Sequence, residues 1–81
     1  MNFVYVLKSQ QDGKRYIGLT NNLEKRLRQH NSGKVKSTKN RRPFSLVYYE
    51  EFEDRSEAAQ REKFFKTGKG REFLNNKLMV L

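Results

Sequence analysis

The residues best suited to chemistry begin with two tyrosines and a glycine. Tyr5, Tyr16 and Gly18 occur in two short segments rich in β-branched and aromatic residues, which are separated by the pair Asp12-Gly13. Asp-Gly between two such segments predicts a β-hairpin, and the expected pairing places the three residues on one face of it. Because glycine has no side chain to stand between the two rings, this face could form a substrate pocket. The same pattern also fits two aromatic residues packed beneath a helix.

Arg26 and His30 form a second candidate cluster. They are four residues apart in a segment with helical periodicity, so both side chains lie on the same side of the expected helix. A guanidinium can hold a phosphate through two hydrogen bonds, and a histidine can donate to a phosphate oxygen or transfer a proton. Lys25 and Arg28 flank the pair, so a basic helix exposed to solvent is the alternative interpretation.

Glu62 is the candidate metal ligand. In a later helical segment it is three or four residues from Ala58, Ala59 and Phe65, on the side expected to face inward. An unpaired carboxylate there would be strongly destabilising, so a cation must compensate for its charge. Mg²⁺ commonly uses one or two protein carboxylates and keeps several waters, so a single glutamate is chemically sufficient when a substrate phosphate supplies another ligand. A salt bridge to Arg26 is the alternative.

A basic, polar stretch spans residues 33–43 and is expected to be an irregular surface loop. Its cations are Lys34, Lys36, Lys39, Arg41 and Arg42. Beside a hydrolytic site they would bind backbone phosphates of a substrate, whereas in isolation they would only keep the loop solvated.

The whole chain is also strongly basic, with a formal net charge of +9. Lysine and arginine that neutralise phosphates release counterions, so this excess predicts salt-dependent, largely sequence-independent binding to nucleic acid. A ribosome-associated basic protein is the other interpretation. The absence of cysteine, the single histidine and the lack of a Gly-x-Ser-x-Gly or phosphate-loop pattern give little support to the common zinc, serine-hydrolase and nucleotide-loop sites. No segment approaches the roughly 20 apolar residues of a membrane span, which indicates a cytoplasmic protein without membrane association.

The elements that must position these residues begin with the hairpin, whose strands are expected at residues 3–8 and 15–20. If Asp12-Gly13 forms the turn, Tyr5 pairs with Thr20. The opposite face is expected to form the core surface by the two-residue periodicity of strands. That face carries Val4, Val6, Ile17 and Leu19.

Helices are expected to follow the hairpin. Asn21 is predicted to cap a first helix that runs to about His30, with Leu23 and Leu27 as its apolar contacts and Gly33 near its end. A third strand is predicted at Phe44–Phe52.

Two further helices complete the chain. One is expected from about Ser56 to Lys66, ended by Gly68, and a last one from about Arg71 to Leu78. The order ββαβαα predicts an α+β fold in which a three-stranded antiparallel sheet is flanked by helices. The length predicts a single domain over residues 1–81.

Together these residues resemble the GIY-YIG nuclease family, in particular its small stand-alone bacterial members, which are related to the amino-terminal nuclease domain of the excision-repair incision subunit. Tyr16-Ile17-Gly18 matches the second family triplet, and Val4-Tyr5-Val6 stands in place of the first. Residues 19–27 with His30-Asn31 resemble the usual continuation, and Ala59-Gln60-Arg61-Glu62-Lys63 resembles the metal-binding helix. The resemblance spans nearly the whole chain.

This resemblance implies an endonuclease that hydrolyses phosphodiester bonds with one divalent metal ion, Mg²⁺ or Mn²⁺. By position in the motifs, Tyr5 would orient or deprotonate the attacking water, with Tyr16 as its rival. Arg26 would steady the scissile phosphate with help from His30, and Glu62 would hold the metal. The implied substrate is nucleic acid, DNA in preference to RNA, and the relationship to the incision subunit implies DNA repair.

The sequence departs from the family pattern in places. The first triplet lacks its glycine, and Leu74 stands where some members carry an asparagine, so Asn75 and Asn76 are left out of the predicted site. One alternative is a non-catalytic nucleic-acid-binding or ribosome-binding module that retains the fold. Another is a subunit that binds a protein partner through the apolar tail Met79-Val80-Leu81, and a homodimer is left open.

Overall fold

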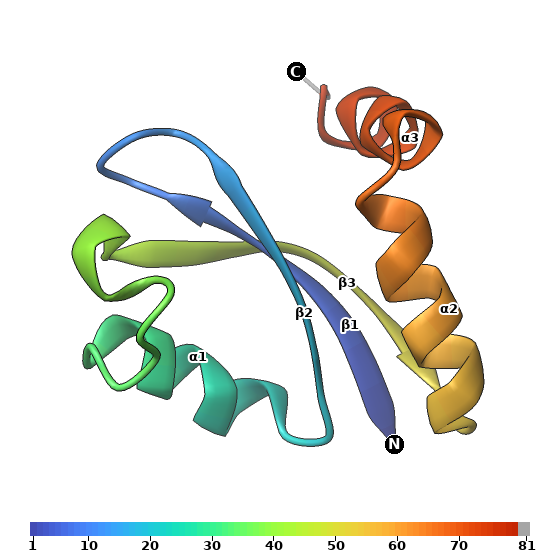
Figure 1. Cartoon of the computed structure of the whole chain (residues 1–81), viewed down its shortest axis with the longest axis horizontal. Helices are drawn as coiled ribbons and strands as arrows, with labels where there is room; N and C mark the ends of the chain where they lie inside the picture. The colour runs from blue at the N-terminus through green and yellow to red at the C-terminus, as the bar shows by residue number, and fades with distance from the viewer. Residues whose placement is uncertain (80–81) are drawn as a thin grey trace.

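The chain folds into a three-stranded antiparallel sheet with helices packed on both faces (Figure 1). The computed structural model describes residues 1–79, so Val80 and Leu81 of the predicted apolar tail lie outside the described residues. The strands are β1 (Asn2–Ser9), β2 (Arg15–Thr20) and β3 (Phe44–Phe52), in the order β2-β1-β3. The predicted α+β class and element order are confirmed, and β2 is an edge strand.

Three α-helices follow the hairpin, namely α1 (Leu23–Asn31), α2 (Arg55–Phe65) and α3 (Gly68–Leu78). Each begins with a polar side chain that accepts a hydrogen bond from a backbone N–H of the first turn, as helix N-termini require. For α1 this residue is Asn22, so the predicted cap at Asn21 was wrong by one position. Among the described residues 1–79, no helix has both the length and the apolar character needed to cross a membrane.

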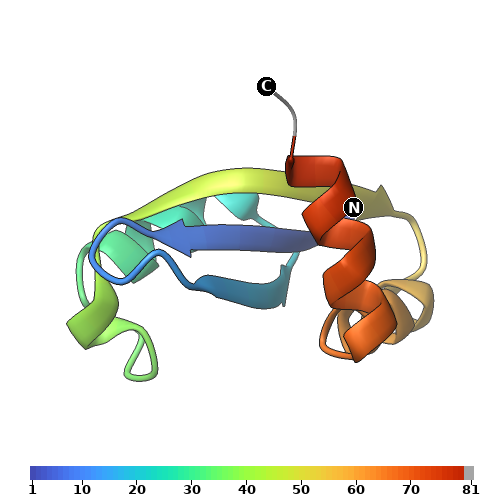
Figure 2. The same ribbon diagram turned by 90° about the horizontal axis from the view of Figure 1, so that it is seen from above.

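Each face of the sheet carries its own apolar cluster. Figure 2 shows that the hairpin turn and the loop after α1 lie at one end of the molecule and α3 at the other. The face toward α2 and α3 carries the predicted core residues Val4, Val6, Ile17 and Leu19. The face toward α1 carries a second cluster, which includes Tyr5, Leu7, Leu23, Leu27 and Phe44. Burying one such large side chain contributes roughly 1.5–3 kcal/mol. The two helix layers therefore hold the sheet from opposite sides.

The hairpin pairs in a register shifted by two residues from the predicted one. Tyr5 faces Gly18 rather than Thr20. The turn is longer than two residues because the hydroxyl of Ser9 accepts hydrogen bonds from two backbone N–H groups within it. A shift of two residues leaves every side chain on its original face, so Tyr5, Tyr16 and Gly18 share a face as predicted.

Gly33 ends α1 as predicted. Its φ of 82° lies in the left-handed region, its N–H donates to the carbonyl of His30, and the N–H of Lys34 donates to the carbonyl of Gln29. These two bonds form a Schellman motif, which satisfies the last carbonyls of the helix. The following stretch is not wholly irregular, as had been expected, because a 3₁₀ turn labelled η1 (Lys39–Arg41) lies within it.

α3 begins three residues earlier than predicted. Gly68 is its first residue and does not end α2, which stops at Phe65. The hydroxyl of Thr67 accepts the N–H of Gly70 at 3.1 Å and so caps the new helix. A Cβ at Gly70 would collide with the backbone of Phe64, so this glycine lets α3 pack closely against the end of α2.

Candidate active site

Tyr5 lies at the centre of a hydrogen-bonded group beside β2. It lies over Gly18, where an added Cβ would collide with the phenol ring. Its hydroxyl oxygen is 2.9 Å from Nε2 of His30 and 3.4 Å from Nε of Arg26. The residue is 1% exposed, and this burial raises the pKa of the Tyr5 phenol. Tyr5 therefore joins β1 to α1 as a neutral hydroxyl at pH 7.

His30 connects Tyr5 to the loop after α1. Both His30 and Thr38 are fully buried, and Nδ1 of His30 is 2.7 Å from Oγ1 of Thr38. Because the Thr38 hydroxyl donates to the carbonyl of Val35, it accepts from Nδ1–H, which leaves Nε2 to accept from the Tyr5 hydroxyl. Burial, and then the charge of Arg26, lower the pKa of His30 to about 4. The imidazole is therefore neutral at pH 7. Because the residue is fully buried, a ligand cannot contact it directly.

Arg26 brings a permanent positive charge to the two phenols. Its Nε donates to the hydroxyl of Tyr5, and its Nη1 donates to Oε1 of Gln29 at 3.1 Å. The hydrogen bond to Tyr5 is the main cause that raises the pKa of Arg26, and the nearby phenol of Tyr16 contributes to the same shift. Arg26 also lines a polar pocket of about 280 Å³ at the end of β2, so its guanidinium is within reach of a ligand.

Tyr16 is the more accessible of the two tyrosines. Its ring centroid is 4.9 Å from that of His30 and 6.3 Å from that of Tyr5. The residue is partly exposed and is among those that line a pocket of about 550 Å³ between β2 and α3, which we call the β2–α3 pocket. Because Tyr5 is buried and Tyr16 is only partly so, Tyr16 is the phenol that a ligand at the β2 edge can approach.

Glu62 approaches the same region from α2. Its side chain is 25% exposed, and Oε2 is 3.3 Å from Nζ of Lys66 one turn later in the helix. After burial and the charge of Tyr16, the negative charge of Glu62 is a further cause that raises the pKa of the Tyr5 phenol. Among the ion pairs of residues 1–79, the partner of Glu62 is Lys66 and not Arg26, the alternative considered from the sequence.

A metal at Glu62 would have one protein carboxylate as its ligand. Within the described part of the chain, no three acidic, histidine or cysteine side chains are grouped so as to hold a metal ion. A single accessible carboxylate suits Mg²⁺, which dehydrates reluctantly and usually takes its remaining ligands from water and substrate phosphate. The donor set fits a metal that binds together with its substrate.

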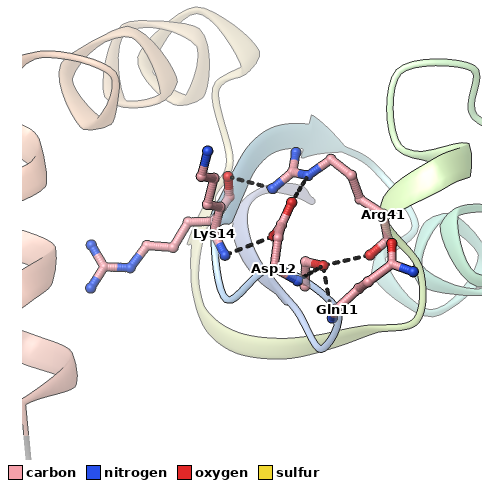
Figure 3. Close-up of polar contacts among 6 residues, drawn as sticks. Gln11, Asp12, Lys14 and Arg41 are labelled. Atoms are coloured by element: carbon pink, nitrogen blue, oxygen red, sulfur yellow. Dashed lines mark hydrogen bonds and ion pairs between the residues drawn. The ribbon is translucent and has the colours of Figure 1, made fainter.

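The basic stretch after α1 packs against the hairpin turn (Figure 3). Nε of Arg41 donates to Oδ2 of Asp12 at 3.0 Å, and the hydroxyl of Ser9 donates to the Arg41 carbonyl at 2.5 Å. The Arg41 guanidinium also lies 5.5 Å from the ring centroid of Phe44. The Arg41 side chain is thus engaged in contacts within the protein, which fix it against the hairpin turn and Phe44. The other cations predicted to bind substrate are exposed, namely Lys34, Lys36, Lys39 and Arg42.

Three residues of this region were not among the predicted site residues. Thr38 fixes the tautomer of His30, Lys66 pairs with Glu62, and Asn75 lines the β2–α3 pocket. The spacing of four between Glu62 and Lys66 on a helix is a signal that sequence reasoning could have used. Thr67 as a helix cap could likewise have indicated the early start of α3.

The arrangement gathers groups that suit a phosphodiester. It combines a partly exposed phenol, a guanidinium that lines the polar pocket, and a carboxylate next to lysine. A guanidinium binds phosphate oxygens directly, and a carboxylate attracts a hard divalent cation. The predicted Tyr5, Tyr16, Arg26 and His30 lie together on the α1 side of the sheet, and Glu62 lies on α2, which packs on the other side.

Comparisons with known proteins identify the family. The family model described as the GIY-YIG catalytic domain matches residues 1–77. The chain is 51% identical over 67 residues to a UPF0213 protein of Clostridium perfringens, covering 82% of this chain and 71% of that protein. It is 47% identical over 66 residues to the UPF0213 protein YazA of Bacillus subtilis, covering 80% and 66% respectively.

The fold has a similar solved structure as well. The solution NMR structure of a UPF0213 protein from Bacillus halodurans matches 94% of this chain and 84% of its own, with a TM-score of 0.57 and 36% sequence identity. The resemblance predicted from the sequence is confirmed, and the matched domain indicates a nuclease-type function.

Proposed function

Because the chain belongs to the GIY-YIG catalytic domain family, we propose that it is a metal-dependent endonuclease that hydrolyses phosphodiester bonds of nucleic acid. The observation that supports this most is the approach of four side chains from four elements to one region. They are Tyr5 from β1, Tyr16 from β2, Arg26 from α1 and Glu62 from α2. The preference for DNA over RNA rests on the resemblance to excision-repair incision nucleases.

In this proposal Tyr16 orients the attacking water, because it is the more exposed of the two phenols. A phenolate at this position would accept a proton as the water oxygen attacks phosphorus and the bond to the leaving oxygen breaks. Arg26 lies beside both phenols, where its charge stabilises negative charge on the phenol and on the phosphate.

Tyr5 and His30 position these groups rather than touch the substrate, because both are buried. The Tyr5 hydroxyl receives the Nε–H of Arg26 and donates to Nε2 of His30, so it fixes the guanidinium relative to β2. The ring of His30 in turn packs edge-to-face against Tyr16. Tyr5 and His30 thereby fix the positions of Arg26 and Tyr16, the two residues that would contact the phosphate.

Glu62 would hold one divalent metal ion, Mg²⁺ or Mn²⁺, through its carboxylate. When bound, such an ion stabilises the charge that develops on the phosphate and on the leaving oxygen. Lys66 must release Glu62 for this, and because exposed pairs contribute only about 0–1 kcal/mol, the exchange costs little.

The proposal is tested with purified protein and labelled DNA and RNA, in Mg²⁺, in Mn²⁺ and in a chelator. Glu62→Gln and Arg26→Ala are each expected to slow metal-dependent cleavage by roughly 100-fold or more, because each removes a charge that stabilises the transition state. The matched controls are Glu57→Gln on α2 and Arg28→Ala on α1, which are exposed and should keep the activity.

The second candidate function is a nucleic-acid-binding or ribosome-binding module without catalysis, which the net charge of +9 favours. It predicts tight, salt-sensitive binding that needs no metal and yields no product. Binding with no cleavage of any substrate in Mg²⁺ or Mn²⁺ would replace the nuclease proposal with this one.

A further inference from the structure

The β2–α3 pocket has a strongly cationic lining. Its volume of about 550 Å³ falls within the range of sites that hold one small ligand. Its positively charged lining residues are Lys14, Arg15, Lys66 and Arg71. None of its lining residues carries a negative charge. A pocket with this charge favours a phosphate-bearing ligand.

The floor of the pocket is apolar, which a site for phosphate alone would not need. Ile17 lines it from β2, and Phe65 and Leu74 close it from α2 and α3. Asn75 adds one amide that can both donate and accept hydrogen bonds. An apolar floor, a single amide and a cationic rim together match a nucleotide, which has a flat base with polar edges and a charged phosphate.

The pocket adjoins the proposed catalytic groups. Tyr16 is one of its lining residues, and Lys66, another of them, is the residue paired with Glu62. At the other end of β2 lies the polar pocket of about 280 Å³ lined by Lys25, Arg26 and Arg55. Because β2 is the edge strand, one nucleic-acid strand could follow it between the two pockets, with Tyr16 and Arg26 on its path.

We propose that the β2–α3 pocket binds an unpaired nucleotide next to the scissile phosphate. In a continuous duplex the bases are stacked inside and only sugar and phosphate reach a protein surface, so such a pocket would stay empty. The nuclease therefore selects single-stranded segments, flaps or frayed ends over intact duplex. This inference rests on the proposed nuclease function, because it assigns the substrate form used at the same site.

The test measures binding of a labelled single-stranded DNA oligonucleotide and of the matching duplex to the full chain, in chelator so that no cleavage occurs. Wild type should bind the single strand at least about tenfold more tightly. Arg71→Glu should weaken single-strand binding about tenfold more than Lys69→Glu does. Lys69 is the control because it is exposed on the same helix, carries the same charge and does not line the pocket.

A second pair of variants tests recognition of the base. Asn75→Ala should lower the preference for a normal strand over one with an abasic residue, whereas Asn76→Ala, its exposed neighbour outside the pocket, should leave that preference unchanged. Equal weakening by Arg71→Glu and Lys69→Glu, or equal affinity for single strand and duplex, would overturn the inference.

The readouts separate this inference from the nuclease proposal. If metal-dependent cleavage occurs but duplex is cut as fast as single strand, the pocket assignment fails and the nuclease proposal stands. If Arg71-dependent single-strand binding is found without cleavage of any substrate, the pocket stands as a binding site and the nuclease proposal fails.

Discussion

At the scale of single residues, three hydrogen bonds link Arg26, Tyr5, His30 and Thr38 into one chain. Each link limits the next, because the acceptor at Thr38 determines which nitrogen of His30 carries the proton, and that nitrogen determines where the Tyr5 hydroxyl points. The spacing of Arg26 and His30 was visible in the sequence. Thr38 was not, since it comes from a loop whose path depends on tertiary packing.

Gly18 sets the position of Tyr5, so we expect Gly18→Ala to displace the phenol. The added methyl would collide with the ring, which is confined by His30. Overpacking of this kind costs about 1–3 kcal/mol of folding free energy, and cleavage should fall roughly tenfold or more as Arg26 loses its partner. Thermal unfolding and cleavage rates measure both effects.

Gly68→Ala is the matched control for this substitution. Nothing lies within 4 Å of a Cβ at Gly68, and its backbone φ is not positive. It should be neutral or slightly stabilising, with unchanged activity. Equal behaviour of the two variants would contradict the role given to Gly18.

In Thr38→Val, we expect that His30 is no longer held in the tautomer protonated at Nδ1. The valine cannot accept Nδ1–H, so a buried donor loses its partner at a cost of about 1–3 kcal/mol. Nitrogen NMR shifts of the ring should show Nδ1 protonated in wild type and in Thr38→Ser, and a mixture of tautomers in Thr38→Val. An unchanged tautomer in Thr38→Val would contradict this account.

We expect the free energy of unfolding to decrease at acid pH as His30, the one histidine in the chain, becomes protonated. Its pKa is about 4 in the fold, held low by burial and by Arg26, against about 6.5 unfolded. Because the folded pKa is the lower one, this stability is fully present above about pH 6.5 and is lost as pH falls toward 4. The loss amounts to about 3 kcal/mol.

Chemical denaturation between pH 4 and 7.5 measures this slope. His30→Gln should flatten it, although its stability at pH 7 will be lower. A slope that is the same in both proteins would assign the acid sensitivity to carboxylates, of which Asp12 and Glu50 also have lowered pKa values.

At the scale of elements, α2 is fastened to the sheet by Arg61, which precedes the proposed metal ligand. Its Nε and Nη2 donate to the two carboxylate oxygens of Glu50 on β3 at 2.8 and 3.1 Å. The guanidinium also lies 4.7–4.9 Å from the ring centroids of three phenylalanines, namely Phe64, Phe65 and Phe73. This contact fixes the rotation of α2 and hence the direction in which Glu62 projects.

Arg61→Lys should therefore destabilise the fold by about 1–3 kcal/mol, because lysine keeps the charge but not the paired hydrogen bonds or the stacking. Arg28→Lys on α1 should have almost no effect, since its pair with Glu24 is largely exposed. Thermal unfolding of both variants checks the difference. A stability loss at Arg28 as large as at Arg61 would contradict this assignment.

The elements themselves were largely predictable from the sequence, because apolar periodicity and capping residues are local. The departures arose where a single hydroxyl changed the outcome, as Ser9 did in the hairpin turn and Thr67 at the start of α3. β3 shows a further limit. An irregularity in its pairing with β1 lets Leu46 face α1 while both Val47 and Tyr48 face the opposite cluster, which no two-residue periodicity predicts.

At the scale of the whole molecule, the two helix layers explain how one small sheet can gather groups from four elements. α1 carries Arg26 on one face of the sheet and α2 carries Glu62 on the other, and Arg26 lines the polar pocket at the end of the edge strand β2. The charge of +9 was evident from composition, but its concentration around the β2–α3 pocket required the fold. A basic surface of this kind attracts a polyanion before any specific contact forms.

The central claim is that Glu62 holds a metal within reach of Tyr16 and Arg26. Mn²⁺ is paramagnetic and broadens the NMR signals of nearby nuclei, so it can be added to the protein bound to an oligonucleotide that resists cleavage. The account predicts selective broadening of the Glu62, Tyr16 and Arg26 side-chain signals, and its loss in Glu62→Gln. Broadening elsewhere, or broadening at these residues that survives Glu62→Gln, would contradict it.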